Sequence, residues 1–223
     1  MSVSGVEGAL PNPPSRVEQV YDAIVDDICT GRLTPGVPLR QELLAARFNV
    51  SRQPVQQALL LLRNQGLVRE FGRRGLEVAP LSADFVRHLY GLRAVLDGYA
   101  ARSSAGRLSP EAVLRGRELV EGGLHADRER AFAHMITADV DFHRFLVVES
   151  GNPLLIESAG VIWRNVQRVM GELLFRGGAP GWVWEDHVAI FAAVESGDAD
   201  EAERLARQHA EHGQSLILDN MEG

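Results

Sequence analysis

The stretch that decides the fold of this chain is Asn49-Val50-Ser51-Arg52-Gln53-Pro54-Val55-Gln56-Gln57-Ala58-Leu59. Its pattern predicts the turn and the second helix of a helix-turn-helix. Asn49 suits the tight turn, because Asn tolerates a left-handed backbone. Ser51 is a good N-cap for the helix that follows, and Pro54 is permitted in the first turn, where the N–H that proline lacks has no helical partner. Apolar residues recur every three or four positions from Val55, which gives this helix an inward face.

Two further helices are expected before this stretch. Apolar residues at helical spacing predict a first helix over about 16–30 and a second over about 40–47. The second is expected to place Leu43, Leu44 and Phe48 in a core. Together with the helix that follows the turn, they complete a three-helix unit.

Beyond Gly66 the pattern changes from helix to two short strands. They are expected at 67–71 and 76–79, with a glycine-bounded tip at 72–75 between them. Three helices followed by a hairpin form a winged helix-turn-helix domain, which we expect to span residues 15–80.

The composition indicates a protein of the cytoplasm. No run of about 18 apolar residues is present, so no transmembrane helix is predicted, and the N-terminus shows no signal peptide. Cys29 is the only cysteine, which excludes an intrachain disulfide. Residues 1–14 hold Gly, Pro, Ser and Asn without periodicity and are expected to be a disordered tail.

The net charge of −7 hides an asymmetry along the chain. Residues 40–80 carry seven Arg and three Glu, a balance of +4, whereas residues 81–223 carry 14 Arg and 22 acidic residues, a balance of −8. A local basic surface is what attraction to phosphates requires, and the acidic remainder can face away from DNA.

Polar side chains at the start of the third helix are the candidate DNA-reading residues. Arg52 and Gln56 share one helix face with Gln53 beside them, in the first turns of a recognition helix, which meet base edges. Arg suits guanine and Gln suits adenine. Contacts to phosphate or the minor groove are expected from Arg40, Ser51, Arg73 and Arg74. The alternative is an exposed polar helix start in a protein–protein module.

Residues 82–220 predict a second, all-helical domain. Ser82 and Ser109-Pro110 are helix starts, and later helices are expected at about 127–149, 153–175, 182–196 and 199–219, with a loop at 177–181. In the first helix, Phe85, Leu89, Leu92, Leu96 and Tyr99 repeat at spacings of three and four and predict its inward face. Six such helices are enough for a bundle with an interior pocket.

Four residues of the helical half form a candidate metal site. Asp139 and His143 lie four apart on one helix face, and His187 and His209 follow on two later helices. If they converge, this donor set suits a divalent ion such as Zn, Ni or Mn. The alternative is that they are polar groups on exposed faces. For Trp163, Trp182 and Trp184, the bundle core is favoured over a pocket or dimer-interface role.

Residues 16–80 resemble the winged-helix domain of the GntR family of bacterial transcriptional regulators. The matching positions are Gly31, Leu33, Pro35, Gly36, Leu39, Leu44, Ala45, Val50, Ser51, Arg52, Pro54, Val55, Ala58, Leu59, Gly66, Leu67, Val68, Gly72 and Gly75. Two positions depart from the family pattern: Gln56-Gln57 replaces Arg-Glu, and Asn49 replaces a glycine in the turn. The resemblance implies an operator-binding protein, and the first departure predicts an altered base preference.

Residues 82–220 resemble the FCD domain of the FadR subfamily within that family. The resemblance rests on Asp139 with His143, on His187 in Glu185-Asp186-His187-Val188-Ala189-Ile190, on His209 after Gly197-Asp198-Ala199, and on Gly151-Asn152-Pro153-Leu154-Leu155. It implies a dimerising bundle that binds small effectors, often carboxylic acids, and in many members a metal held by the four matching residues. The family's basic residue in the first helix of the domain falls on Arg93, which could hold an effector carboxylate. The alternative for Arg93 is an ion pair with Asp97.

Two functions are carried forward from the sequence. The first is a DNA-binding transcriptional regulator, a repressor in the more common family arrangement, whose homodimer binds a two-fold operator and responds to a small carboxylic acid. The second is a metal-dependent enzyme with an accessory winged helix. The sequence offers no separate general base and no nucleophile motif for the second, so we predict that the chain is not an enzyme.

Overall fold

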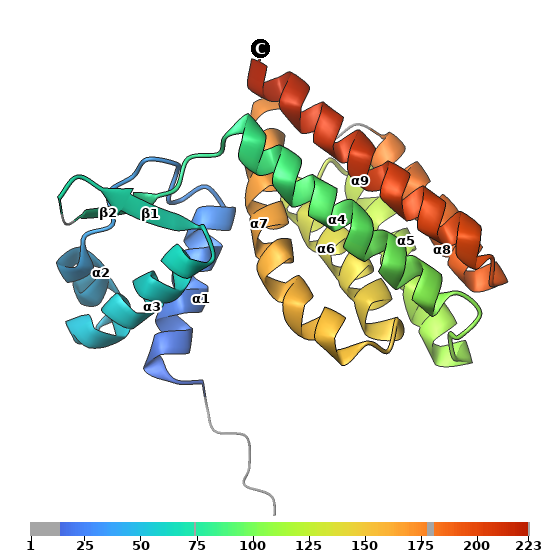
Figure 1. Ribbon diagram of the computed structural model, residues 1–223, viewed down its shortest axis with the longest axis horizontal. Helices are drawn as coiled ribbons and strands as arrows, with labels where there is room; N and C mark the ends of the chain where they lie inside the picture. The colour runs from blue at the N-terminus through green and yellow to red at the C-terminus, as the bar shows by residue number, and fades with distance from the viewer. Residues whose placement is uncertain (1–13, 74, 178–180, 223) are drawn as a thin grey trace, which may run out of the picture. The chain divides into compact units, whose positions relative to one another are not determined.

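The computed structural model of the chain describes residues 14–73, 75–177 and 181–222 (Figure 1). The predicted tail at 1–14 therefore falls outside the described residues except for Pro14. The wing residue Arg74 and most of the predicted loop at 177–181 also fall outside them. The chain divides into two compact units, one made of the residues up to Ile28 with Arg32–Pro80 and the other of Cys29–Gly31 with the residues from Leu81 onward, and each unit is described by itself.

The first unit is a three-helix winged helix-turn-helix. Its elements are α1 (Arg16–Cys29), α2 (Gln41–Phe48), α3 (Arg52–Asn64), β1 (Val68–Phe71) and β2 (Gly75–Val78). The strands pair antiparallel with Val68 opposite Val78. Asn49 ends α2 with a φ of 52°, in the left-handed region, so its predicted place in the tight turn is confirmed.

The core of the first unit is formed by one apolar face from each helix and the start of the wing. Its fully buried members include Ile24, Val55, Ala58, Leu59, Leu62, Leu67 and Val78. Leu43 was expected in this core, but that prediction is wrong, because the side chain is 64% exposed. Leu44 and Ala45 are the buried residues of α2, and Leu43 lies about 100° around the helix from Leu44. Ser51 occupies the N-cap position of α3 in extended conformation, but its hydroxyl accepts no capping hydrogen bond.

A buried carboxylate joins α1 to α2. Asp27 is 1% exposed, and its oxygens lie 2.6 Å from Arg32 Nε and 2.5 Å from Arg47 Nη1. Burial alone would raise the pKa of Asp27, but the two guanidinium groups outweigh it, so the pKa lies below its ordinary value. The ionised Asp27 therefore contributes to the stability of this unit at neutral pH.

The second unit is all helical in its described parts. Its helices are α4 (Ala83–Ser104), α5 (Pro110–Arg128), α6 (Phe132–Glu149), α7 (Pro153–Gly177), α8 (Trp182–Ser196) and α9 (Ala199–Glu222). The predicted caps are present: Ser82 Oγ accepts from Phe85 N and Ser109 Oγ accepts from Ala112 N, both at 3.1 Å. The expected helix start at 127 is wrong, because α5 continues to Arg128 and a left-handed Arg130 separates it from α6. Among the described residues, no helix is long and apolar enough to cross a membrane.

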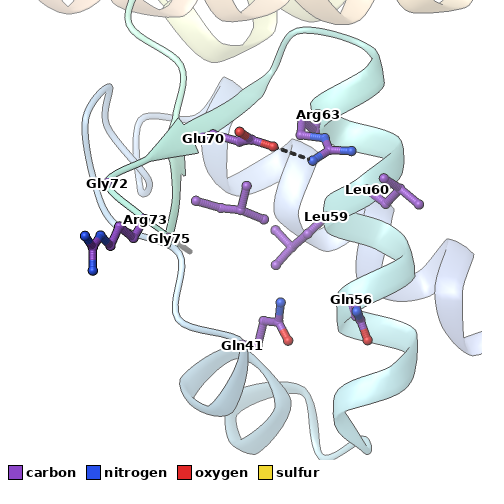
Figure 2. A pocket seen from close by; sticks show the side chains of 10 residues that line it. Gln41, Gln56, Leu59, Leu60, Arg63, Glu70, Gly72, Arg73 and Gly75 are labelled. Carbon is purple, nitrogen blue, oxygen red and sulfur yellow. Dashed lines mark hydrogen bonds and ion pairs between the residues drawn. The ribbon is translucent and has the colours of Figure 1, made fainter.

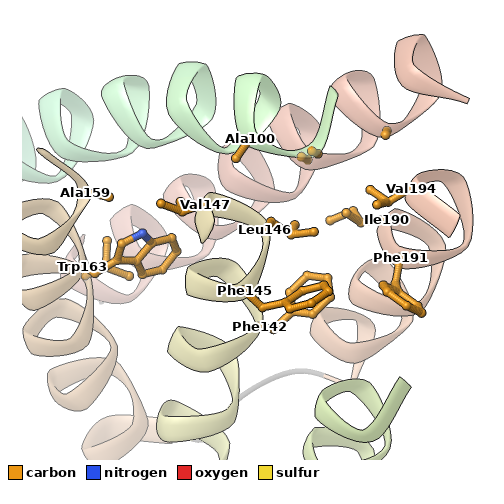
Figure 3. Close-up of a cluster of buried hydrophobic side chains, with 14 of the residues drawn as sticks. Ala100, Phe142, Phe145, Leu146, Val147, Ala159, Trp163, Ile190, Phe191 and Val194 are labelled. Atoms are coloured by element: carbon orange, nitrogen blue, oxygen red, sulfur yellow. The ribbon is translucent and has the colours of Figure 1, made fainter. Parts of the chain in front are cut away.

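The core of the helical unit lies around α6 (Figure 3). Phe142, Phe145 and Leu146 of α6 pack with Ile190, Phe191 and Val194 of α8 and with Ala100 of α4, and Trp163 of α7 lies in the same cluster. Two glycines allow α5 to approach α8. A Cβ on Gly116 would lie 2.2 Å from the Phe191 ring, and one on Gly123 would lie 1.9 Å from the Trp184 ring.

The predicted inward face of α4 is partly correct, because Leu89 is buried and Phe85 and Leu96 pack against the core. Leu92 and Tyr99 are 49% and 44% exposed, whereas the buried face carries Tyr90, Arg93 and Asp97. Apolar periodicity therefore identifies only part of the inward face, because the buried side of α4 also presents charged groups to the bundle interior.

Candidate functional site

Six of the seven predicted DNA-contacting residues lie within the described part of the chain, and all six are exposed: Arg40, Ser51, Arg52, Gln53, Gln56 and Arg73. Arg52 Nη1 lies 3.3 Å from Glu42 Oε1, with both side chains more than 60% exposed. An ion pair this exposed contributes about 0–1 kcal/mol. Arg52 can therefore leave Glu42 at little cost when another anionic or acceptor group is offered.

A pocket of about 300 Å³ lies between α3 and the wing (Figure 2). Gln56 and Arg73, both predicted from the sequence, line it together with Gln41, Leu59, Leu60, Arg63, Glu70, Gly72, Gly75 and Leu76. Arg63 Nη1 donates to Glu70 Oε1 at 2.8 Å across the pocket edge. Sequence reasoning missed Arg63, although it follows Gln56 by seven positions and therefore lies on the same helix face.

Asp139, His143, His187 and His209 converge in the helical unit. Asp139 and His143 come from α6, His187 from α8 and His209 from α9, and one donor atom from each lies within 4.8 Å of the others. All four residues are buried, at 3% exposure or less. The alternative of exposed polar faces is therefore excluded by the structure for these four residues.

The spacing of the donor atoms matches metal coordination. His187 Nε2 lies 3.2 Å from the Nε2 atoms of both His143 and His209, and 3.4 Å from Asp139 Oδ1. Two ligand nitrogens at ordinary zinc bond lengths are about 3.0–3.4 Å apart for octahedral or tetrahedral angles. A single cation can therefore contact all four residues after small adjustments.

Outer carboxylates lie beside two of the three imidazoles, and one of the two forms a hydrogen bond. Asp186 Oδ2 lies 3.3 Å from His209 Nδ1, and Asp97 Oδ2 lies 3.4 Å from His143 Nδ1. The Asp186 contact favours the His209 tautomer that keeps the Nε2 lone pair free, as in metal sites generally, whereas His143 Nδ1 has no hydrogen-bond partner among the described residues. Within the described residues, the buried Asp139 Oδ2 has no hydrogen-bond partner. A metal ion would satisfy this atom, so the residues present fit such a group.

Burial also sets the charge state of the imidazoles. It lowers the pKa of His143 and His187 well below the ordinary value, and nearby Arg93 and His209 act in the same direction. The pKa of His209 is lowered as well, again mainly by burial. Neutral imidazole is the form that binds a metal ion, so the site holds its histidines ready for coordination at neutral pH.

Arg93 reaches the centre of this cluster from α4. Its Nη2 lies 2.8 Å from His143 Nε2 and 3.4 Å from His209 Nε2, while its Nε donates to Asp97 Oδ2 at 2.9 Å. Its guanidinium also stacks over Trp163 at 4.7 Å. The ion pair of Arg93 with Asp97 is therefore present, and the same guanidinium faces the predicted metal ligands. Its role toward an effector carboxylate stays a prediction.

The tryptophans surround the cluster to different degrees. Trp163 stacks on His143 at 4.6 Å between ring centroids, and Trp184 contacts His187 edge-on at the same distance. Both are buried at 7% exposure or less, so they belong to the core and also form walls of the site. Trp182 lies near the surface and contacts His212, which is half exposed beside Asp186.

The fold and the two sites define a class of protein: a winged-helix DNA-binding regulator with a helical ligand-binding domain. Comparison with known families agrees. Residues 16–78 match the model of the bacterial regulatory proteins of the gntR family, and residues 88–212 match the FCD domain. The chain belongs to the GntR family and carries an FCD domain, which confirms the resemblance predicted from the sequence.

Similar proteins are named as transcriptional regulators. The chain is 28% identical over 203 residues to the HTH-type transcriptional repressor RspR of Escherichia coli K12, covering 89% of this chain and 87% of that protein. It is 30% identical over 217 residues to the repressor NanR of Klebsiella aerogenes, covering 86% and 81%. The solved structure of E. coli McbR/YncC shares the fold, with a TM-score of 0.82 at 19% identity over 94% and 100% of the two chains.

These comparisons decide between the two predicted functions. The chain is a DNA-binding transcriptional regulator of a family whose FCD domains bind effectors. The alternative of a metal-dependent enzyme is not supported, because the matched families and the similar proteins are regulators. The prediction that the chain is not an enzyme is thereby confirmed.

Proposed function

We propose that this protein is a cytoplasmic repressor that binds a two-fold operator as a homodimer and releases it when a small carboxylic acid binds in the helical domain. Its similarity to RspR and NanR, both named as repressors, supports this direction of control. The observation that carries the effector half of the proposal is the buried Asp139 and histidine cluster with Arg93 beside it.

The DNA-reading half of the proposal rests on α3. Arg52, Gln53 and Gln56 would contact base edges in the major groove, because they are exposed on the first turns of this helix. Arg40, Ser51, Arg73 and Arg74 would contact phosphates or the minor groove. Gln56 and Arg73 both line the pocket between α3 and the wing, so a DNA backbone bound there would lie between the reading helix and the wing.

An exposed apolar stripe on α4 supports the homodimer. Leu92, Val95 and Tyr99 are each 44–49% exposed at spacings of three and four, and a Cβ on Gly91 would meet nothing within 4 Å. A second copy of the same helix could cover this stripe, because a two-fold interface is self-complementary. Sedimentation of the protein with Val95→Glu, compared with the wild type, tests this: an unchanged dimer would exclude the stripe as the interface.

A divalent metal in the cluster would be held by Asp139, His143, His187 and His209. When bound, the metal supplies a Lewis-acidic centre for an anionic ligand oxygen. The chain's own contribution to carboxylate binding is Arg93, whose planar guanidinium can form paired hydrogen bonds to a carboxylate. Burial of the cluster excludes competing water and strengthens these electrostatic contacts.

Metal analysis and thermal unfolding of matched variants test the metal proposal. Purified wild-type protein should contain, or take up, about one Zn, Ni or Mn ion per chain, and its unfolding temperature should rise with metal. His187→Ala should lose both effects. His134→Ala is the control, because His134 lies on α6 like His143 but is exposed. Equal metal content in all three proteins would overturn the proposal.

Effector control is tested on the same proteins with operator DNA. A panel of small carboxylic acids should include one that weakens operator binding by the wild type. The same acid should weaken operator binding by Arg93→Ala less than it weakens binding by the wild type. Without any acid, the two proteins should bind the operator with equal affinity. If no carboxylic acid altered either unfolding temperature or operator binding, the proposed effector class would be wrong.

A further inference from the structure

Arg93 points at the same nitrogen atoms that a metal ion would use. Its Nη2 is 2.8 Å from His143 Nε2 and 3.4 Å from His209 Nε2, and it lies 4.0 Å from Asp139 Oδ2, an atom with no hydrogen-bond partner in the described part of the chain. The guanidinium is 3% exposed. It therefore lies inside the ligand cluster rather than at its rim.

The chemistry of these atoms makes the two cations exclusive at His143. A guanidinium has only donors, so its contact with an imidazole nitrogen uses the lone pair of that nitrogen. A neutral imidazole has one such lone pair, and the 2.8 Å contact with a guanidinium that can only donate places it on Nε2. This lone pair cannot accept a hydrogen bond from Arg93 and coordinate a metal at the same time. The like charges of a guanidinium and a divalent ion at this separation also repel each other.

We propose that Arg93 is a tethered cation that competes with the divalent metal for His143, and that metal binding releases its Nη2 for the effector carboxylate. This inference rests on the proposed metal site. Asp97 is the tether, because it holds Arg93 Nε at 2.9 Å and faces His143 Nδ1 with the same oxygen. Metal and carboxylate then bind in order, and each tightens the binding of the other.

The competition predicts an unusual effect of removing a buried residue. Arg93→Gln should bind Zn²⁺ more tightly than the wild type, measured by competition with a chromogenic chelator. The variant lacks the charge-assisted hydrogen bond from Arg93 that opposes the metal. Loss of such a bond corresponds to roughly a tenfold to hundredfold gain in Zn²⁺ affinity. Arg93→Gln/Asp97→Asn removes both members of the buried pair, which avoids a lone buried carboxylate and excludes that carboxylate as the cause of any gain.

The outcomes separate this inference from the proposed function. Tighter Zn²⁺ binding by the double variant, lost again when His187→Ala is added, supports the competition. Zn²⁺ binding by the wild type through His187 with no gain in either Arg93 variant overturns the competition and leaves the metal site standing. If neither the wild type nor the variants bind Zn²⁺, the metal site and the competition both fall.

A measurement on the wild type alone gives a second test that does not depend on how the variants fold. The affinity of the protein for acetate is measured by calorimetry with and without saturating Zn²⁺. Acetate is chosen because it binds free Zn²⁺ only weakly. Acetate should bind at least tenfold more tightly with the metal, and the Arg93 side-chain Nε resonance should shift when Zn²⁺ alone is added. An unmoved resonance would mean that Arg93 stays on His143 and would refute the exchange.

Discussion

Two adjacent glycines of α5 should respond in opposite directions to the same substitution. Gly122 has nothing within 4 Å of an added Cβ, whereas a Cβ on Gly123 would lie 1.9–2.3 Å from three ring carbons of Trp184. Trp184 is 1% exposed and packs edge-on against His187, so its ring has little room to withdraw. The pair therefore separates helix propensity from packing within one turn of one helix.

The magnitudes follow from the two environments. Replacing Gly by Ala inside a helix gains about 0.5–1 kcal/mol, and Gly122→Ala should realise this gain. At Gly123 the same gain is opposed by an overlap in a close-packed core, where added volume costs about 1–3 kcal/mol and sometimes more. We expect Gly123→Ala to destabilise the protein by a net amount of about 1–2 kcal/mol.

Urea unfolding followed by circular dichroism measures both changes, with fluorescence of the tryptophans as a second probe. Gly122→Ala should raise the midpoint and Gly123→Ala should lower it. The Gly123 variant should also lose metal affinity, because displacement of Trp184 is transmitted to His187. Stabilisation of similar size in both variants would refute the packing argument, since the overlap would then have been relieved without cost.

Three further outcomes are expected. Gln56→Arg should change one base preference in each half-site, with about 1–3 kcal/mol against the wrong base; identical consensus sequences selected from random DNA by the two proteins would contradict this. Glu70→Gln should strengthen operator binding severalfold and steepen its salt dependence, because it removes an anion that pairs with Arg63 beside the reading helix; a titration at several salt concentrations measures this, and weaker binding would mean that the pair positions the wing. Asp27→Asn should destabilise the winged helix by about 1–3 kcal/mol at pH 7. Since the folded-state pKa of Asp27 is lowered, its contribution is present above the ordinary value of 3.8 and is lost as the pH falls through the folded pKa, so the variant should show a weaker loss of stability in acid than the wild type.

The winged helix could be predicted almost completely from the sequence, because each of its elements carries a local signal. Asn49 marks the turn, the apolar spacing from Val55 marks the buried face of α3, and glycines bound the wing. Leu43 was wrongly expected in the core, because two adjacent leucines in a helix of two turns do not reveal which of them faces inward. The Arg63–Glu70 pair was missed because it joins a helix to a strand, and no spacing within one element indicates such a contact.

The helical unit was harder to predict where polar groups face inward. Hydrophobic periodicity wrongly placed Leu92 and Tyr99 of α4 in the core and gave no sign that Arg93 and Asp97 lie on the buried face. The convergence of His187 and His209 with Asp139 depends on how three helices pack. Spacing alone could not establish that convergence, and it entered the prediction through the family resemblance.

The two glycine contacts of α5 determine where the predicted metal ligand His187 lies along α8. Gly116 meets Phe191 and Gly123 meets Trp184, so contacts seven residues apart on α5 match contacts seven residues apart on α8, about 10.5 Å along each axis. Two matched positions prevent α8 from sliding along α5, whereas one would not. A slip by a single turn, about 5.4 Å, would carry His187 beyond reach of the other three ligands. A helix that donates no ligand therefore fixes the axial position of one that does.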